Sequence, residues 1–296
     1  MILLTGPNSM IGRAVISSLS DNKIGFCPVY HDECNLESFD ECYSRFEYCN
    51  ADTLIHLAGY NGNIQFNLKN PTDIFYKTAQ MGLNVLRCAE IFKYKKIIAI
   101  LSSCAYPDLA GSMMEHQLWD GECNHTVSCH GYSKRMLDAY GQHLRSKGIS
   151  YTSCIVQNSY GPFDSLDLNK TKVVTALIIK ILNAKKNNEN VICWGTGSPK
   201  REFIYSKDVG NAIVKCLYTD ANRINIGSGE EISIKDLVIK IADIIGFTGE
   251  IIWDTTKEDG QNQKKLSLTL MQDLGLEITP LSQGLKETIS WVESQL

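Results

Sequence analysis

The residues whose types and spacing point most directly to chemistry lie near the start of the chain, in the segment TGPNSMIG (residues 5–12). This segment joins an apolar run, residues 1–5, to a stretch with helical spacing, residues 11–19. Glycines at such a strand-to-helix turn let the backbone approach a pyrophosphate, which then lies at the helix N-terminus. Ser9 stands where the usual fingerprint has its middle glycine. By spacing alone, a tight turn in an unrelated α/β fold therefore competes with a dinucleotide site.

Three further groups of residues lie beside predicted strands and helices. Leu57, Ala58 and Gly59 close an apolar run that begins at residue 53. The segment SSCAYP (102–107) follows the apolar run 97–101, and YSK (132–134) opens a helical stretch that reaches residue 147. Open α/β sheets bind ligands at the carboxyl ends of their strands. We therefore expect the segments that follow strands to lie near the glycine turn.

The eleven cysteines suggest neither a metal centre nor a disulfide framework. They lie at positions 27, 34, 42, 49, 88, 104, 123, 129, 154, 193 and 216, with no Cys-x-x-Cys pair. An odd count without a secretion signal favours free thiols in a reducing compartment. Most of them are expected to act as small buried apolar side chains, and we predict no metal site.

Strands and helices alternate through the first half of the chain. We predict strands at 1–5, 24–30, 53–58, 97–101 and 151–156, and helices at 11–19, 72–94, 132–147, 173–184, 234–245 and 281–294. This order indicates an α/β protein with a Rossmann-type, doubly wound parallel sheet and a smaller C-terminal α/β substrate-binding lobe. We assign residues 1–162 and 206–228 to the dinucleotide-binding domain, and 163–205 and 229–296 to the substrate lobe.

The bulk composition excludes several classes of partner. The net charge of −4 over 296 residues argues against a nucleic-acid-binding protein. No apolar run approaches the roughly 20 residues that span a bilayer. The first ten residues lack the basic leader and cleavage site of a signal peptide. We expect a cytoplasmic protein with no nucleic-acid or membrane partner.

Four blocks far apart in the sequence resemble the GDP-L-fucose synthase family of extended short-chain dehydrogenase/reductases, which also has related GDP-4-keto-heptose reductases. They are SSCAYP (102–107), NSYGP (158–162), WGTGSPKREF (194–203) and WDTTKEDG (253–260). Asn67, Pro71 and Asn84 also match the family, and the resemblance covers nearly the whole chain. It implies an NADPH-dependent oxidoreductase of nucleotide-sugar biosynthesis that acts on a GDP-linked keto sugar. It also implies a homodimer formed through the helices at 72–94 and 132–147.

The resemblance identifies candidate catalytic residues. Carbonyl reduction needs a hydride donor and a proton for the developing alkoxide, and the superfamily uses a Ser or Thr with a Tyr-x-x-x-Lys pair. Ser102 and Lys134 match this set, but His130 stands at the tyrosine position. We favour His130 as the proton donor, because imidazole titrates near neutrality. Recruitment of Tyr132 by a distortion at the helix start is an alternative, and a degraded, non-catalytic site is another.

The family also epimerises C3 and C5 of its substrate with a cysteine and a histidine. Cys104 matches the cysteine, but Lys172 occupies the histidine position. A lysine beside a diphosphate would stay protonated and would be a poor base. We therefore predict reduction of the C4 keto group of a GDP-4-keto-sugar, a 6-deoxyhexose or a heptose, with epimerisation weak or absent and Cys104 a remnant. A bifunctional 3,5-epimerase/4-reductase is the alternative, and a non-catalytic dinucleotide-binding protein is a second one from another class.

The remaining candidates would bind the cofactor and the GDP-sugar. NADPH is expected from the resemblance: Arg13 and a protonated His31 would suit its 2′-phosphate, whereas Asp32 would suit ribose hydroxyls and favour NADH. The predicted cofactor residues are Gly6, Asn8, Ser9, Met10, Ile11, Gly12, His31, Asp32, Leu57, Ala58, Gly59 and Lys134. The predicted substrate residues are Asn158, Lys172, Val173, Trp194, Arg201, Lys257 and Asp259. Trp194 would stack on guanine and Arg201 would bind phosphate.

Overall fold

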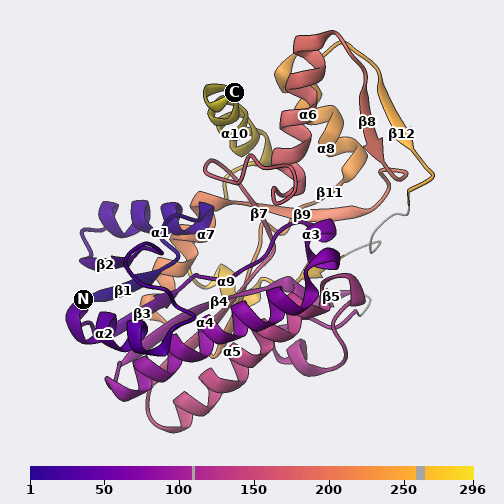
Figure 1. The fold of residues 1–296 in the computed structure, drawn as a ribbon. Coiled ribbons are helices and arrows are strands. Elements are labelled where there is room, and N and C mark those ends of the chain that lie inside the picture. Colours follow the sequence, from indigo (N-terminus) through magenta and orange to yellow (C-terminus); the bar gives the residue numbers. More distant parts are fainter. Residues whose placement is uncertain (109–110, 258–263) are drawn as a thin grey trace.

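A parallel sheet of six strands forms the centre of the larger of two lobes in the computed structural model, which describes residues 1–108, 111–257 and 264–296 (Figure 1). Its strands, in the spatial order β10-β6-β4-β3-β1-β2, are β10 (Arg223–Ile226), β6 (Ser150–Val156), β4 (Lys96–Ser102), β3 (Thr53–His56), β1 (Ile2–Thr5) and β2 (Phe26–Val29). All five pairings are parallel. The chain moves outward from β1 to β2 and then returns to β3 on the other side of β1. The carboxyl ends of β1 and β3 therefore flank the switch point at which doubly wound sheets bind ligands.

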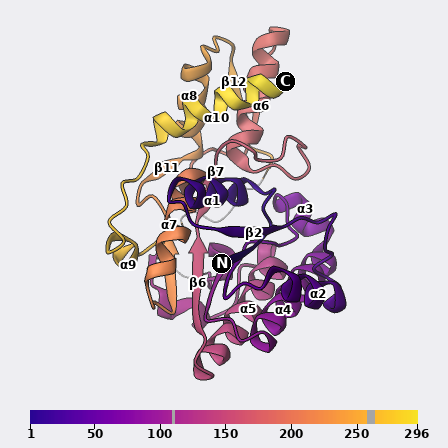
Figure 2. The ribbon, with the colours of Figure 1, turned by 90° about the vertical axis from the view of Figure 1, so that its left-hand side faces the viewer.

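Helices cover both faces of this sheet (Figure 2). On one face lie α1 (Met10–Asp21) and α7 (Ser206–Lys215), and on the other lie α2 (Phe39–Cys49), α4 (Pro71–Ile91) and α5 (Ser128–Ser146). Side chains along a strand alternate between the faces. Leu4 thus joins the core beneath α1 and α7, whereas its neighbour Leu3 joins the core beneath α4 and α5. The predicted Rossmann-type fold is confirmed.

The smaller lobe has its own sheets and core. A three-stranded sheet consists of β11 (Glu231–Ser233), β9 (Lys200–Tyr205) and β7 (Asn158–Tyr160), and β8 (Val191–Trp194) pairs with β12 (Ile251–Asp254). Three helices pack against them: α6 (Val173–Asn187), α8 (Ile234–Ile245) and α10 (Leu281–Gln295). The domain boundaries stay a prediction. Leu266 and Met271, which we assigned to this lobe, pack in the two cores of the larger one.

The remaining elements are short. They are α3 (Ile64–Lys69), η1 (Ser103–Ala105), β5 (Ser112–Met113), η2 (Glu115–Trp119), η3 (His125–Val127), η4 (Cys216–Tyr218), β13 (Lys265–Leu266) and α9 (Thr269–Gln272). In the described ranges no helix is long and apolar enough to cross a membrane.

One difference from the predicted elements that bears on the site concerns the helix expected at 132–147. This helix, α5, begins at Ser128, directly after η3. His130 and Tyr132 consequently lie inside a regular helix, and His130 and Lys134 are one turn apart on the same face. The proposed distortion that would recruit Tyr132 has no counterpart at the start of α5.

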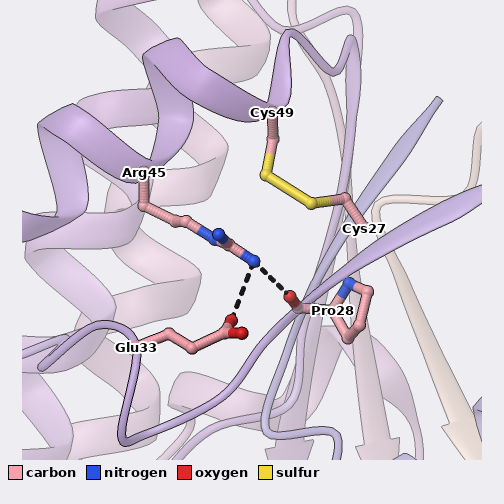
Figure 3. The surroundings of a disulfide bond; sticks show 5 residues. All are labelled: Cys27, Pro28, Glu33, Arg45 and Cys49. Atoms are coloured by element: carbon pink, nitrogen blue, oxygen red, sulfur yellow. Dashed lines mark hydrogen bonds and ion pairs between the residues drawn. A yellow bond between two sulfur atoms is a disulfide. The ribbon is translucent and has the colours of Figure 1, made fainter.

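One pair of cysteines corrects the expectation of free thiols. Cys27 on β2 and Cys49 at the end of α2 form a disulfide (Figure 3). Beside it, Arg45 donates to the carbonyl of Pro28 at 2.8 Å and pairs with Glu33 at 2.9 Å. The two cysteines are 22 positions apart in the sequence, the segment between them includes most of α2, which returns the chain to the sheet edge, and no sequence motif signals this contact. The other nine cysteines, all within the described ranges, are free.

Candidate active site

The turn between β1 and α1 leaves no room for side chains at its glycines. A Cβ atom on Gly6 would lie 2.9 Å from the Ala58 nitrogen, and one on Gly12 would lie 2.1 Å from the Gly6 oxygen. Gly6 also has a φ of +71°, in the left-handed region that favours glycine. Ser9 has a φ of −71° and needs no glycine there. Its hydroxyl caps α1 by accepting from the Gly12 N–H at 3.0 Å and donates to the Gly6 carbonyl at 2.9 Å.

The ends of β1 and β3 are tied together beside this turn. The Thr5 hydroxyl lies 2.8 Å from His56 Nδ1 and accepts from the backbone N–H groups of Leu57 and Ala58 at 3.2 and 3.4 Å. Leu57 and Met10 are buried, so they contribute only backbone atoms to the crevice. A crowded glycine turn that ends in a helix N-terminus suits a dinucleotide pyrophosphate.

The residues predicted to choose between NADPH and NADH lie in exposed positions next to the glycine turn. His31 and Asp32 occupy the turn after β2, the strand that pairs with β1. Arg13 on α1 donates to the Asn8 side-chain oxygen at 3.1 Å, and its guanidinium lies 5.8 Å from the centre of the Phe163 ring. Arg13 is thus held at the rim of the site, where it can reach an added phosphate.

The start of α5 packs directly on the segment that follows β4. A Cβ atom on Gly131 would lie 2.4 Å from the Cys104 carbonyl oxygen, so only glycine permits this approach. Ser102, the last residue of β4, accepts a hydrogen bond from the Cys104 N–H at 3.2 Å. The packing brings His130 on α5 next to the segment that carries Ser102 and Cys104. Three of the predicted catalytic residues therefore belong to two elements in direct contact.

Lys134 reaches from α5 toward the end of β3. Its Nζ lies 3.3 Å from the position that a Cβ atom on Gly59 would occupy. The side chain is buried, and this burial lowers the pKa of Lys134 to about 8. Its charge helps to lower the pKa values of His56 and His130. Lys134 thus lies next to Gly59 at the end of β3 and acts electrostatically on His130.

His130 is 4% exposed and has one hydrogen bond to its ring in the described part of the chain, between Nε2 and Asn61 Nδ2 at 3.2 Å. Burial is the main cause that lowers the pKa of His130 to about 3, and the charges of Lys134, Lys172 and Lys264 lower it further. This corrects the expectation that the ring titrates near neutrality. Without ligands, the imidazole of His130 is neutral at pH 7.

Tyr132 faces a different environment. Its ring lies 5.4 Å from the guanidinium carbon of Arg135, which is also 5.3 Å from the Trp119 ring. Arg135 is buried and donates to the Ala105 carbonyl at 2.7 Å. Tyr132 therefore packs on a cation that holds the end of the η1 segment, and His130 is the residue one helical turn from Lys134.

Lys172 caps the start of α6 and points into the same region. Its Nζ donates to the Ser159 hydroxyl at 2.9 Å, and it lies close enough to Cys104 for their charges to interact. Burial lowers the pKa of Lys172, although Asp164 and Cys104 oppose this shift. The expectation that Lys172 stays protonated beside a diphosphate remains a prediction. Val173, the next residue, is 40% exposed.

The nucleotide side of the predicted site lies in the smaller lobe. Trp194, at the end of β8, is 57% exposed and has the Lys180 ammonium 5.7 Å from its ring centre. A solvent-facing indole of this kind can stack on a base. Arg201 is half-buried on β9 and donates to the Lys200 carbonyl at 2.7 Å.

Two other predicted substrate residues are described, and one is not. The Asn158 amide on β7 already donates to the Glu202 carbonyl at 3.0 Å. Lys257 is exposed in the turn after β12. Asp259 lies outside the described residues.

Sequence reasoning missed four polar residues around this site: Asn61, Arg135, Ser159 and Lys264. Asn61 contacts the predicted catalytic residue His130, Ser159 contacts the predicted substrate residue Lys172, Arg135 holds the segment after β4, and Lys264 contributes charge near His130. Ser159 lies in the block NSYGP, where only its neighbour Asn158 was selected, and the other three belong to none of the blocks singled out in the sequence. Their partners come from other elements, so only the fold shows the contacts.

Comparison with known proteins identifies the family. Residues 2–227 match the profile of the NAD dependent epimerase/dehydratase family. The GDP-L-fucose synthase of Dictyostelium discoideum is 31% identical over 301 residues, which cover 98% of this chain and 94% of that protein. The crystal structure of a GDP-L-fucose synthetase from Naegleria fowleri bound to NADP is 29% identical, with a TM-score of 0.91 over 99% of this chain and 94% of that one. A GDP-6-OMe-4-keto-L-xylo-heptose reductase from C. jejuni shares the fold at 20% identity, with a TM-score of 0.92 over 100% of this chain and 98% of that one. The chain therefore belongs to the NAD-dependent epimerase/dehydratase family of extended short-chain dehydrogenase/reductases, in the group of NAD(P)-dependent oxidoreductases that includes the GDP-L-fucose synthases.

Proposed function

We propose that this enzyme reduces the C4 keto group of a GDP-4-keto-sugar with NADPH and uses His130 as the proton donor. The observation that supports the proposal is the contact between α5, which carries His130 and Lys134, and the segment that follows Ser102 at the end of β4. The similarity to GDP-L-fucose synthases supports a GDP-linked substrate. A homodimer through α4 and α5, and a cytoplasmic location, are part of the same proposal.

The chemistry follows from the positions of these side chains. NADPH, when bound at the glycine turn, supplies the hydride that adds to the carbonyl carbon. The Ser102 hydroxyl donates a hydrogen bond to the carbonyl oxygen and polarises it. His130 gives a proton to that oxygen as negative charge develops, which leaves a hydroxyl group on the sugar and a neutral imidazole that water reprotonates. The Lys134 ammonium stabilises the same developing charge.

Ligand binding must make the His130 ring a competent acid. In the protein alone, burial and then the charges of Lys134, Lys172 and Lys264 oppose its protonation. A GDP-sugar and NADPH bring several phosphate charges into this region, and a nearby negative charge raises the pKa of a histidine. We therefore expect the bound ligands themselves to raise the pKa of His130 and so make its ring the proton donor.

A bifunctional 3,5-epimerase/4-reductase is the second candidate function, and one observation favours it. Lys172 and Cys104 lie close enough for their charges to interact, and burial moves the pKa of Lys172 toward the range of a base. In that mechanism one of these two groups removes a proton beside the keto group and the other returns one to the opposite face.

Turnover of GDP-4-keto-6-deoxyhexoses and GDP-4-keto-heptoses in deuterium oxide, with NADPH or NADH, tests both functions. We expect NADPH oxidation and a product without carbon-bound deuterium. Deuterium at C3 or C5 that disappears in Lys172→Ala would establish the bifunctional alternative. The absence of NAD(P)H oxidation with every such substrate, despite tight cofactor binding, would refute the reductase and support a non-catalytic binding protein.

A further inference from the structure

The imidazole of His130 reaches toward a single polar side chain from another element. Asn61 lies in the loop after β3, and its Nδ2 is 3.2 Å from His130 Nε2. No other hydrogen bond to this ring is found in the ranges that the structure describes, where Nδ1 is buried without a partner. The two nitrogens therefore have opposite surroundings: Nδ1 is sealed inside the protein and Nε2 faces Asn61.

Asn61 itself is exposed, whereas His130 is 4% exposed. The Asn61 amide thus lies between the buried ring and the open side of the site. A proton that leaves the ring for a ligand must leave from Nε2, since Nδ1 has no path to the open side.

An asparagine suits this place because its side chain has both a donor and an acceptor. Its NH₂ group donates to Nε2 when the ring is neutral and unprotonated at that atom. After a rotation of the amide, its carbonyl oxygen accepts from an Nε2–H. The same residue can thus satisfy Nε2 before and after proton transfer, which an alanine, a leucine or a lysine cannot do.

We propose that Asn61 is a positioning residue for proton transfer, which holds His130 Nε2 toward the substrate and keeps the buried Nδ1 protonated in the resting enzyme. This inference rests on the proposed role of His130. In the part of the chain that the structure describes, the charged groups that act on the ring are cationic: Lys134 on α5, Lys172 at the start of α6, and Lys264 before β13. Among these described residues the neutral amide of Asn61 is the group bonded to Nε2.

The test is a double-mutant cycle with Asn61→Ala in the wild-type and His130→Tyr backgrounds, with Gln65→Ala, an exposed amide on the neighbouring helix, as the control. We expect Asn61→Ala to lower kcat about 10-fold, the worth of one hydrogen bond. KM values for both substrates should stay within about twofold, since the effect is confined to proton transfer. In the His130→Tyr background the same change should have no effect beyond about twofold. Equal losses in both backgrounds would show a merely structural role and overturn the inference.

Asn61→Asp gives a readout that structural damage does not mimic. A carboxylate beside Nε2 favours the charged ring, so the alkaline limb of the kcat profile should move up by at least about one pH unit. Nitrogen-15 NMR of the ligand-free enzyme tests the contact without turnover. The spectra should show a proton on Nδ1 in the wild type and a higher pKa of the His130 ring in Asn61→Asp. If the NMR titration gives the His130 ring the same pKa in Asn61→Asp as in the wild type, the proposed role of Asn61 is overturned. A wild type that never oxidises NAD(P)H would instead refute the proposed function alone.

Discussion

Replacement of Gly131 by alanine tests how the fold positions the catalytic groups. The new methyl group would lie 2.4 Å from the Cys104 carbonyl oxygen and 2.8 Å from Cys123 Sγ. Since Cβ contacts below 3.0 Å essentially do not occur, α5 and the segment after β4 must separate by at least about 0.6 Å. Such overpacking costs about 1–3 kcal/mol, of which the better helix propensity of alanine returns at most about 1. We expect a net loss of about 1–2 kcal/mol in the free energy of unfolding.

The same displacement should harm catalysis more than stability. A shift of about 1 Å between reacting groups can cost roughly 100-fold in rate, so we expect kcat of Gly131→Ala to fall by about 10- to 100-fold at a temperature where the variant is folded. Urea unfolding and initial rates of NADPH oxidation measure the two effects. Gly25→Ala is the matched control, because a Cβ atom there meets nothing within 4 Å. Wild-type kcat and stability in Gly131→Ala would refute the claim that this contact sets the geometry of the site.

Three further predictions concern pH and the cofactor. His56 and His130 have pKa values near 3 in the folded protein, so the unfolded chain binds more protons below pH 6.5 and stability falls as the pH drops. Each of these histidines should lower the free energy of unfolding by about 2 kcal/mol between pH 6.5 and 5. Urea unfolding of His130→Gln should therefore show about half the loss of stability of the wild type over this pH range. An equal loss would contradict a buried, neutral His130. Burial lowers the pKa of Lys134 to about 8, so kcat/KM should fall above that pH as the charge is lost, and Lys134→Arg should remove this limb of the pH–rate profile. Gly12→Ala, whose Cβ atom would lie 2.1 Å from the Gly6 oxygen, should weaken NADPH binding about 10- to 100-fold by fluorescence titration, and wild-type affinity would argue against the glycine turn as the cofactor site.

Much of the fold follows from apolar periodicity, and the exceptions have physical reasons. The helix predicted at 234–245 is observed with those bounds because its apolar residues repeat at a clear 3.6-residue spacing. Helix α2 was missed because its sequence, FDECYSRFEYC, contains no aliphatic residue and its ends depend on Ser38 and the left-handed Asn50. Helix α7 was missed because it is short and contains Gly210, whose Cβ atom would lie 2.6 Å from Ala14 backbone atoms. There the close contact between helices, rather than helix propensity, determines the residue.

The residues of the candidate site also fall into those that the sequence predicts and those that only the fold shows. The glycine turn and Ser102 lie at strand ends and Lys134 lies in the second turn of α5, where motif spacing together with the family resemblance predicted them. The partner of His130, Asn61, comes from a loop 69 residues away and carries no motif of its own. The pKa of His130 could not be predicted either, because it depends on burial and on lysines from three separate elements. Motifs and the family resemblance thus predict candidate reacting groups, whereas only the fold shows the burial and the charges that shift their pKa values.

The most direct test of the proposed reductase is the kcat of His130→Ala with a GDP-4-keto-sugar and NADPH. His143→Ala, an exposed histidine on the same helix, is the control. If His130 is the proton donor, kcat should fall at least about 100-fold while NADPH affinity is unchanged, and the control should match the wild type. A kcat of His130→Ala within twofold of the wild type would contradict the assignment of the proton donor and, with it, the proposed mechanism.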